Sequence, residues 1–566
     1  MKYKFRKIFF LSILIVIFFR LSNANADERM IPPYAILDGN NIRAWFYSSG
    51  IFDQYLINNN YPGFEWPKGT GQYAVFTAGL SCGAYVQGSL REFMSSFKGE
   101  LALGYIIDSS GFPKAVSDFR FKIWKVSRTD NHINNPDWLN WGLMIPYGAP
   151  YIDVNHNNTY EPLIDTPGVR NASQTIFMCL TDGYPGEHKI GEGFGGGTAP
   201  MYAEVRLTAW CYDLPGLQDV QFMKWQVINK NNYLWDSTYF AIISDPDLGF
   251  AGDDYVGCDT IRRLGFCYNG DNNDEGSYSY GINPPAVGFK LLHTKNNQNI
   301  SMSSFISVPS TSSPSPACEK PPYGETLPAY YMMQGIKKDR TPWVVPPGGS
   351  ASYVTKFCYS GDPETGMGWN EGVPGNPSGC VLNCGGPNSY YGNIVSVNPL
   401  GNRFMLLSLG SNLLIINPGD TQIIIAAQLI ARGSNYLNSV TKLKQLSDFA
   451  QHYYDSVSVI GVNNISYYVP EQYKLYQNYP NPFNPSTKMA FAVTGSPLER
   501  GKGGKQVKLV IYDILGKEIA TLINEQLKPG TYEAEWNGSN YPSGVYFYSL
   551  IINGGIIDTK KLVLLK

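Results

Sequence analysis

Residues 473–487 read Tyr-Lys-Leu-Tyr-Gln-Asn-Tyr-Pro-Asn-Pro-Phe-Asn-Pro-Ser-Thr, and the stretch that they open decides the fold of this end of the chain. Pro480, Pro482 and Pro485 fix backbone φ and remove amide donors, so the segment is predicted to be an extended lead-in rather than a helix. Five stretches rich in β-branched, aromatic and aliphatic residues follow at 488–493, 507–512, 531–536, 545–552 and 559–565. Gly, Pro and Asn separate them, and Asn553-Gly554 is a two-residue hairpin signal. The pattern predicts a sheet of alternating strands.

Three further motifs lie in this region: Val-Ile-Tyr-Asp-Ile-Leu-Gly-Lys-Glu at 510–518, Pro-Gly-Thr-Tyr at 529–532 and Ser-Gly-Val-Tyr-Phe-Tyr at 543–548. With the proline-rich motif, they resemble a type IX secretion C-terminal sorting domain. The resemblance implies an immunoglobulin-like β-sandwich over 473–566 that the outer-membrane type IX translocon and its processing machinery recognise. The positions that carry it are Tyr479, Pro480, Asn481, Pro482, Phe483, Asn484, Pro485, Gly516, Gly530 and Gly544. A terminal immunoglobulin-like binding module is the alternative.

The first 26 residues have the pattern of a secretory signal peptide. A basic start at 2–7 precedes an apolar run at 8–19, and Ala24-Asn-Ala26 predicts cleavage after Ala26. The apolar run is shorter than the roughly 20 residues that cross a bilayer, so a cleaved signal peptide is favoured over a membrane anchor. Both ends of the chain therefore predict passage through the periplasm to the extracellular space or the outer cell surface.

Composition favours a mainly β protein. The chain has 58 glycines, 38 prolines and 40 tyrosines but only 16% charged residues, which is typical of many short strands and turns. A formal net charge of −2 argues against a nucleic-acid surface. We expect a β-sandwich-like cargo of two or more units with one late helix at 435–454, where apolar residues recur at helical spacing. The expected division is 1–26 signal peptide, 27–200 β-rich region, 201–460 sandwich-like region ending in the helix, 461–472 linker and 473–566 sorting domain.

The segment 151–165 places oxygen side chains at a spacing that suits calcium, a hard cation that takes six to eight oxygen ligands. The candidate ligands are Asp153, Asn155, Asn157, Glu161 and Asp165. The segment resembles the Asp-x-Asn-x-Asn loops of calcium-binding repeats, but it lacks the EF-hand glutamate. The alternative is that these residues cap turns.

A second acidic loop spans 245–259. Its five carboxylates would repel one another at neutral pH unless water or a cation screens them. The candidate ligands are Asp245, Asp247, Asp253, Asp254 and Asp259. A solvated turn, or a pair of catalytic carboxylates for glycoside hydrolysis, remains open.

Nine cysteines in an exported chain predict disulfides, with at least one thiol left over. Cys258 with Cys267, and Cys380 with Cys384, are close enough in sequence to close small loops. No second cysteine or histidine pair supports a metal site at Cys380 and Cys384.

Catalytic patterns are weak. Gly79-Leu-Ser-Cys-Gly83 matches a nucleophile elbow, but the residues after Ser81 favour a strand over the required helix, so Ser81 is interpreted as a turn residue. The histidines at 132, 156, 188, 293 and 452 follow no triad order. The sequence favours a structural or binding role toward a surface glycan or matrix component, stabilised by calcium. The alternative is a secreted hydrolase of polysaccharide or protein that uses the acidic-loop carboxylates.

Overall fold

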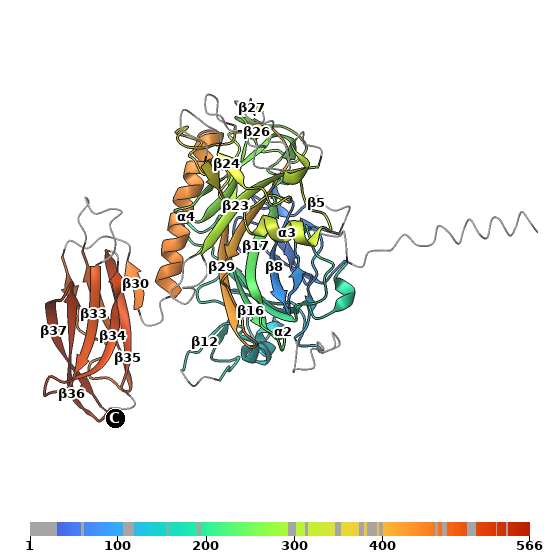
Figure 1. Cartoon of the computed structure of the whole chain (residues 1–566). Helices are drawn as coiled ribbons and strands as arrows, with labels where there is room; N and C mark the ends of the chain where they lie inside the picture. Colours follow the sequence, from blue (N-terminus) through green and yellow to red (C-terminus); the bar gives the residue numbers. More distant parts are fainter. Residues whose placement is uncertain are drawn as a thin grey trace, which may run out of the picture. The chain divides into compact units, whose positions relative to one another are not determined.

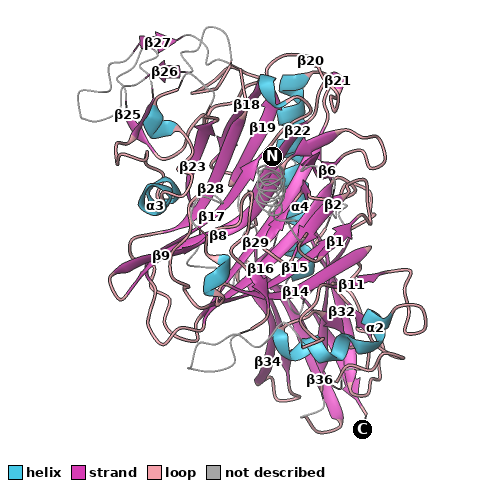
Figure 2. Cartoon of the chain, turned by 90° about the vertical axis from the view of Figure 1, so that its right-hand side faces the viewer, coloured by secondary structure: helices cyan, strands magenta, loops and turns pink. Residues whose placement is uncertain are grey.

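The computed structural model of the chain describes residues 31–57, 61–105, 118–155, 157, 159–189, 194–292, 301–311, 315–345, 353–372, 379–381, 393–395, 400–458, 462–466, 472–494, 505–527, 529–538 and 541–565. Strands dominate these residues (Figures 1 and 2), which confirms the mainly β class. The predicted cleavage site at Ala26 lies outside the described residues. No described helix has the length and apolar character needed to cross a membrane.

The first large sheet of the cargo is antiparallel throughout its described pairings. Its order is β1 (Tyr34–Leu37), β2 (Ala44–Tyr47), β3 (Ile51–Phe52), β8 (Thr77–Val86), β17 (Asp236–Asp245), β28 (Arg403–Gly410) and β23 (Met302–Pro309), with β9 (Ser89–Phe93) paired to β8. Strands from the predicted regions 27–200 and 201–460 therefore lie in one sheet.

The second large sheet is also antiparallel. Its order is β10 (Ala102–Leu103), β14 (Gln174–Thr181), β15 (Ala203–Cys211), β16 (Val220–Asn229), β29 (Thr421–Ala431), β22 (Ala286–Leu291), β19 (Leu264–Asn269) and β18 (Asp254–Asp259), with β11 (Trp124–Ser127) paired to β14. The cargo also has separate two-stranded ribbons: β4 (Gln54–Tyr55) with β5 (Tyr61–Pro62), β6 (Phe64–Glu65) with β7 (Tyr73–Val75), β12 (Tyr151–Ile152) with β13 (Thr166–Pro167), β20 (Asn273–Asp274) with β21 (Gly281–Ile282), β24 (Trp343–Val345) with β25 (Tyr353–Thr355), and β26 (Gly379–Val381) with β27 (Asn393–Val395).

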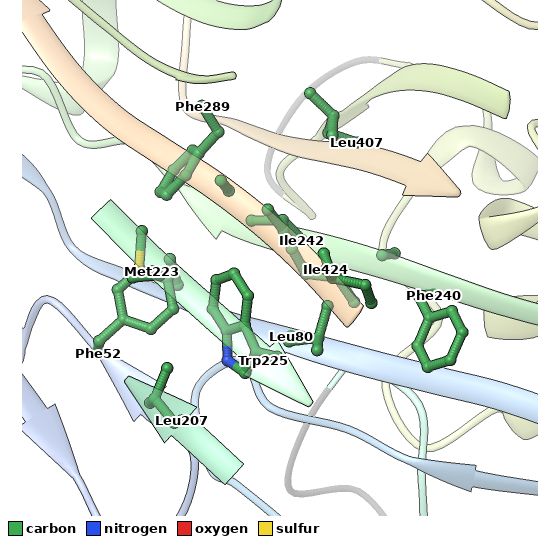
Figure 3. Close-up of a cluster of buried hydrophobic side chains, with 14 of the residues drawn as sticks. Phe52, Leu80, Leu207, Met223, Trp225, Phe240, Ile242, Phe289, Leu407 and Ile424 are labelled. Atoms are coloured by element: carbon green, nitrogen blue, oxygen red, sulfur yellow. The ribbon is translucent and has the colours of Figure 1, made fainter. Parts of the chain in front are cut away.

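One hydrophobic core holds the two sheets together. Figure 3 shows Leu80 and Ile242 of the first sheet near Trp225 and Ile424 of the second. The ring of Phe52 lies 6.3 Å from that of Trp225. Because residues of both sheets share this core, the cargo is a two-layer β-sandwich. The described residues from 31 to 291 and from 301 to 444 form one compact unit, in which the expected regions 27–200 and 201–460 both contribute strands to each large sheet.

Helices are few among the described residues (Figure 2). They are α2 (Pro136–Asn140), α3 (Thr326–Met333) and α4 (Tyr436–Ser458), and α3 packs on β9, β17 and β28. Helix α4 confirms the helix predicted at 435–454, and the Asn435 side chain accepts the Asn438 backbone N–H at 2.8 Å as its cap. Val440 and Leu443 are fully buried, whereas Phe449, predicted to lie on the same stripe, is 37% exposed.

The C-terminal unit, made of the described residues between 445 and 565, has its own core. Two antiparallel four-stranded sheets build it: β30 (Val462–Ser466), β35 (Gly530–Asn537), β32 (Ser486–Val493) and β31 (Lys474–Leu475), then β34 (Glu518–Leu527), β33 (Lys505–Tyr512), β36 (Gly544–Ile552) and β37 (Gly555–Leu564). The five predicted strands are confirmed. The predicted hairpin is also confirmed, with Asn553 and Gly554 at φ 49° and 84°. Strand β34 was missed, and the predicted linker 461–472 is wrong at β30, which pairs with β35.

Candidate functional site

The second acidic loop begins where β17 ends and continues into β18. Asp245 closes β17, Asp253 lies in the 3-10 turn η3 (Ala251–Asp253), and Asp254 opens β18. These three side chains are 5%, 8% and 1% exposed, so the loop is not a solvated turn. Ordinary surface loops keep carboxylates in water, and burial of several together needs a compensating charge.

Backbone amides satisfy part of this cluster. Asp254 Oδ2 accepts the Leu248 N–H at 3.0 Å, which closes the turn after β17. Asp274, a buried residue of β20, accepts the N–H groups of Phe250 and Tyr280 at 3.0 and 2.5 Å. These bonds explain how the loop holds its shape around buried acids.

Other oxygens of the cluster have no hydrogen-bond partner among the described residues. They are Asp245 Oδ1, Asp253 Oδ1, Asp253 Oδ2, Asp254 Oδ1 and Asn402 Oδ1. Asn402 precedes β28, and its amide nitrogen donates to Asp247 Oδ1 at 3.1 Å. These five atoms are acceptors, whereas the side-chain amide nitrogen of Asn269, beside Asp253, is a buried donor without a partner among the described residues.

The pKa values of these buried carboxyl groups lie above the usual range of aspartate. Burial raises the pKa of Asp245 and Asp254 well above the ordinary range, and the neighbouring Asp247 raises that of Asp245 further. Burial raises the pKa of Asp247 and of Asp253 to about 7. Protons therefore neutralise part of the cluster near neutral pH. Within the described ranges, no group of three His, Cys, Asp or Glu side chains is placed to hold a metal ion by itself.

Asp259, the fifth predicted ligand, lies at the other end of β18 from Asp254. Its carboxylate forms an ion pair with Arg262 at 2.8 Å, and hydrogen bonds from Arg262 lower its pKa despite partial burial. Because Arg262 already neutralises it, the structure does not bring Asp259 into the cluster.

The first loop, 151–165, gathers its predicted ligands but satisfies them internally. Asp165 accepts the N–H groups of Val154 and Glu161 at 2.9 and 2.7 Å. Glu161 Oε2 accepts the side-chain amides of Asn155 and Asn157 at 2.6 and 2.7 Å. Asp153 Oδ1 accepts the Asn157 N–H at 3.2 Å. These turn-closing bonds match the alternative stated from the sequence.

A third buried cluster escaped the sequence prediction because its members come from distant segments. His188 Nδ1 lies 3.6 Å from Glu100 Oε1, and His188 Nε2 lies 3.8 Å from Asp182 Oδ2. Burial raises the pKa of Asp182 to about 6 and that of Glu100 to about 7. Asp182 also accepts the N–H groups of Met201 and Ala203, so the cluster ties the segment before β15 to the core.

Ser81 is not a turn residue, contrary to its interpretation from the sequence. It lies in the middle of β8, is fully buried, and its Oγ accepts the Ser95 N–H at 3.0 Å. No helix follows it, because β8 runs on to Val86. A nucleophile elbow is therefore excluded at this position.

The structure does not contain the disulfide between Cys258 and Cys267 that the sequence suggested. Cys258 and Cys267 are free thiols on neighbouring strands, and neither faces the other in the register, because Cys258 pairs with Gly265 and Cys267 with Val256. The free thiols are Cys82, Cys179, Cys211, Cys258, Cys267 and Cys358. Cys318 is not among them; Cys384 and the Cys380 side chain lie outside the description.

We expect these six thiols to resist iodoacetamide in the folded protein. Burial raises the pKa of Cys82, Cys258 and Cys267 well above the usual range, and only the thiolate reacts. Mass spectrometry should show labelling only after unfolding in guanidinium. A peptide pair that joins Cys258 to Cys267, or rapid labelling of the native chain, would contradict the structure.

The proline-rich motif at 479–485 is held by hydrogen bonds to β37, the last strand of the C-terminal unit. Phe483 is 2% exposed, its ring lies 5.5 Å from that of Trp536, and its N–H donates to Val563 O at 2.9 Å. Asn481 Oδ1 accepts the Val563 N–H at 2.9 Å, whereas Tyr479 is 81% exposed. Gly516 turns the chain between β33 and β34 at φ 79°, while Gly530 and Gly544 open β35 and β36.

Residues 477–565 match the family model of the secretion system C-terminal sorting domain. The chain carries a type IX sorting domain. This domain is the part of the protein that interacts with the type IX secretion machinery. The protein is exported to the extracellular space or the cell surface.

Comparisons of the whole chain add little to this result. No curated protein matches it. A polysaccharide lyase aligns with a TM-score of 0.18 and 6% identity over 64% of this chain and 34% of that one. The Escherichia coli alpha-2-macroglobulin activated by porcine elastase aligns with a TM-score of 0.11 and 8% identity over 96% and 46%. The chain thus spans less than half the length of either protein, and similarities this low carry no argument about the cargo.

Proposed function

We propose that the exported cargo is a structural or binding protein of the cell surface, with a glycan or matrix component as its ligand, and that calcium stabilises it. The observation that supports calcium is the set of buried, unpartnered oxygens in the 245–254 cluster. Calcium takes oxygen ligands from carboxylates, amides and carbonyls. A divalent cation would compensate the charge of Asp245, Asp247 and Asp254, whose pKa values are raised by burial.

Mixed ligands fit this cluster better than acids alone. Asp245 and Asp254 each offer one free oxygen, and Asn402 offers an amide oxygen. Backbone carbonyls of the same loop and waters would complete the coordination. This set does not require three converging acidic side chains. For the 153–165 loop, calcium binding remains a weaker proposal, because its oxygens already accept hydrogen bonds.

The burial of the acids supports a structural role over catalysis. A catalytic carboxyl group must contact its substrate, yet Asp245 and Asp254 are 5% and 1% exposed. The second candidate function is a secreted hydrolase of polysaccharide or protein. One observation favours it: the pKa of Asp253, about 7, suits a general acid at neutral pH.

Asp254→Asn separates these proposals. The substitution keeps the shape of the side chain and removes its charge. For a cation site, we expect calcium to raise the melting temperature of the full exported chain by several degrees, and this gain to disappear in Asp254→Asn. Asp259→Asn is the matched control, because its Arg262 pair lies apart from the cluster, and it should keep the calcium response.

Hydrolase activity is checked on the same variants. A hydrolase should release reducing sugar from soluble β-glucan or xylan, or peptides from casein, and lose this turnover in Asp253→Asn while its melting temperature is unchanged. Absence of any calcium response in the wild-type chain would remove the calcium proposal. Turnover that depends on Asp253 would replace the structural role with the second candidate.

A further inference from the structure

Two hollows meet at Tyr85, at the end of β8. One has a volume of about 630 Å³ and the other about 600 Å³, a size that fits small ligands. The lining of the larger includes Tyr85, Gln87, Asn232, Tyr233, Asp236 and Asn417. The lining of the smaller includes Tyr85, Ser89, Arg91, Thr198, Thr326 and Leu327. Tyr85 is the residue common to both linings.

Packing behind the Tyr85 ring holds it in place. Tyr330 of α3 meets it edge-on, with centroids 5.6 Å apart and an interplanar angle of 89°. Tyr330 packs in turn on Tyr239 at 5.8 Å and donates its hydroxyl hydrogen bond to Ser237 O. Such bracing fixes the ring before any ligand arrives, which lowers the entropy cost of binding.

A β-bulge places a carboxylate beside this ring. Asp236 pairs with Tyr85 across β17 and β8, and the register shifts between Asp236 and Tyr239. Ser237 lies at φ 52°, which is strained for a residue with a side chain. Bulges of this kind re-aim side chains next to functional sites. The Asp236 carboxylate is exposed, accepts Ser237 Oγ at 3.3 Å and has no cationic partner among the described residues.

The chemistry of the hollows matches a sugar chain. Sugar rings present apolar C–H faces, which pack on aromatic rings, and neighbouring hydroxyls, which pair with carboxylates and amides. Tyr85 and Tyr233 supply rings, Tyr233 being 49% exposed, and Asp236 and Asn232 supply the polar groups. On the other side, Arg91 is anchored by donating to Pro200 O at 2.7 Å.

We infer that the two hollows bind a saccharide chain across Tyr85, with sugar units on both sides of the ring. The inference rests on the proposed binding role and names its ligand class. The site is independent of the acidic cluster, because Asp236 and Asp245 begin and end β17, roughly 30 Å apart at the usual strand rise. Loss of one site should therefore leave the other intact.

The test is native electrophoresis of the full exported chain through gels that contain barley β-glucan, xylan, galactomannan or dextran. We expect at least one polysaccharide to retard the wild-type chain. Tyr85→Ala and Asp236→Asn should weaken that binding roughly tenfold or more. Tyr353→Ala is the matched control, since Tyr353 is a 58% exposed tyrosine of β25 outside both hollows, and it should bind as the wild type does.

Asp236→Asn keeps the experiment decisive if Tyr85→Ala unfolds, because Asp236 is exposed and the change is isosteric. Equal retardation of wild type and Asp236→Asn, with Tyr233→Ala also unchanged, would overturn the location. No retardation in any gel, with binding to gelatin-coated plates, would overturn the saccharide site but keep a matrix-binding role. No binding to polysaccharide, gelatin or whole exporting cells would overturn the binding role as well.

Discussion

A chain that lacks residues 473–566 is expected to accumulate in the periplasm, with at least a tenfold loss from the cell surface and medium. The sorting domain interacts with the secretion machinery, and its hydrophobic core is separate from that of the cargo, so removal of 473–566 should leave the cargo sandwich folded although β30 loses its partner β35. Immunoblots of the periplasm, outer membrane and medium measure the distribution. The reciprocal control joins residues 473–566 to a periplasmic reporter, which should then reach the surface.

Point variants distinguish recognition of the folded domain from recognition of a peptide. Trp536 is 4% exposed, and Trp536→Ala should cost about 3–5 kcal/mol of the domain's stability. Tyr479→Ala removes a side chain that is 81% exposed and should leave the fold intact. Loss of export in Trp536→Ala indicates that the machinery requires the fold. Normal surface levels of the chain without 473–566 would contradict the role of the domain in this protein.

The C-terminal unit was largely predictable because its signals are local. Alternating strands, turn residues and the Asn553-Gly554 hairpin lie within short windows, and the structure confirms them. Strand β34 was missed because Glu518-Ile-Ala-Thr-Leu-Ile-Asn-Glu-Gln-Leu527 mixes good helix formers with strand formers. Its pairing with β33, through two register shifts, decides its conformation, and no local pattern contains that information.

The acidic cluster was predictable only in part, for the same reason. Asp245, Asp247, Asp253 and Asp254 are close in sequence, so their spacing is visible. Asn402 joins them from the segment just before β28, more than a hundred residues away. Likewise, no local pattern shows that β8 and β17 pair across the expected boundary between 27–200 and 201–460. Composition can predict strands, but it does not show which strands share a sheet.

The calcium-free exported chain is expected to be more stable near about pH 5 than near about pH 8. In the unfolded chain, Asp and Glu titrate near 4. In the folded chain, burial raises the pKa of Asp182 to about 6 and those of Glu100, Asp247 and Asp253 to about 7. The folded state therefore binds more protons across this window. The contribution of these acids to the free energy of unfolding is fully present below their unfolded pKa values. It is lost as the pH rises through their folded pKa values, by a few kcal/mol in total.

Calcium should offset only the part of the stability loss at high pH that comes from the 245–254 cluster. The cation competes with protons for the same oxygens, so it should raise the melting temperature strongly near about pH 8 and little near about pH 5. Asp254→Asn should lose the calcium gain, yet it should retain the calcium-independent slope from Asp182 and Glu100. Scanning calorimetry with EGTA or with calcium at both pH values measures each part. A calcium gain that is equal at the two pH values would contradict displacement of protons, since a cation bound outside the buried acids has no reason to depend on their titration.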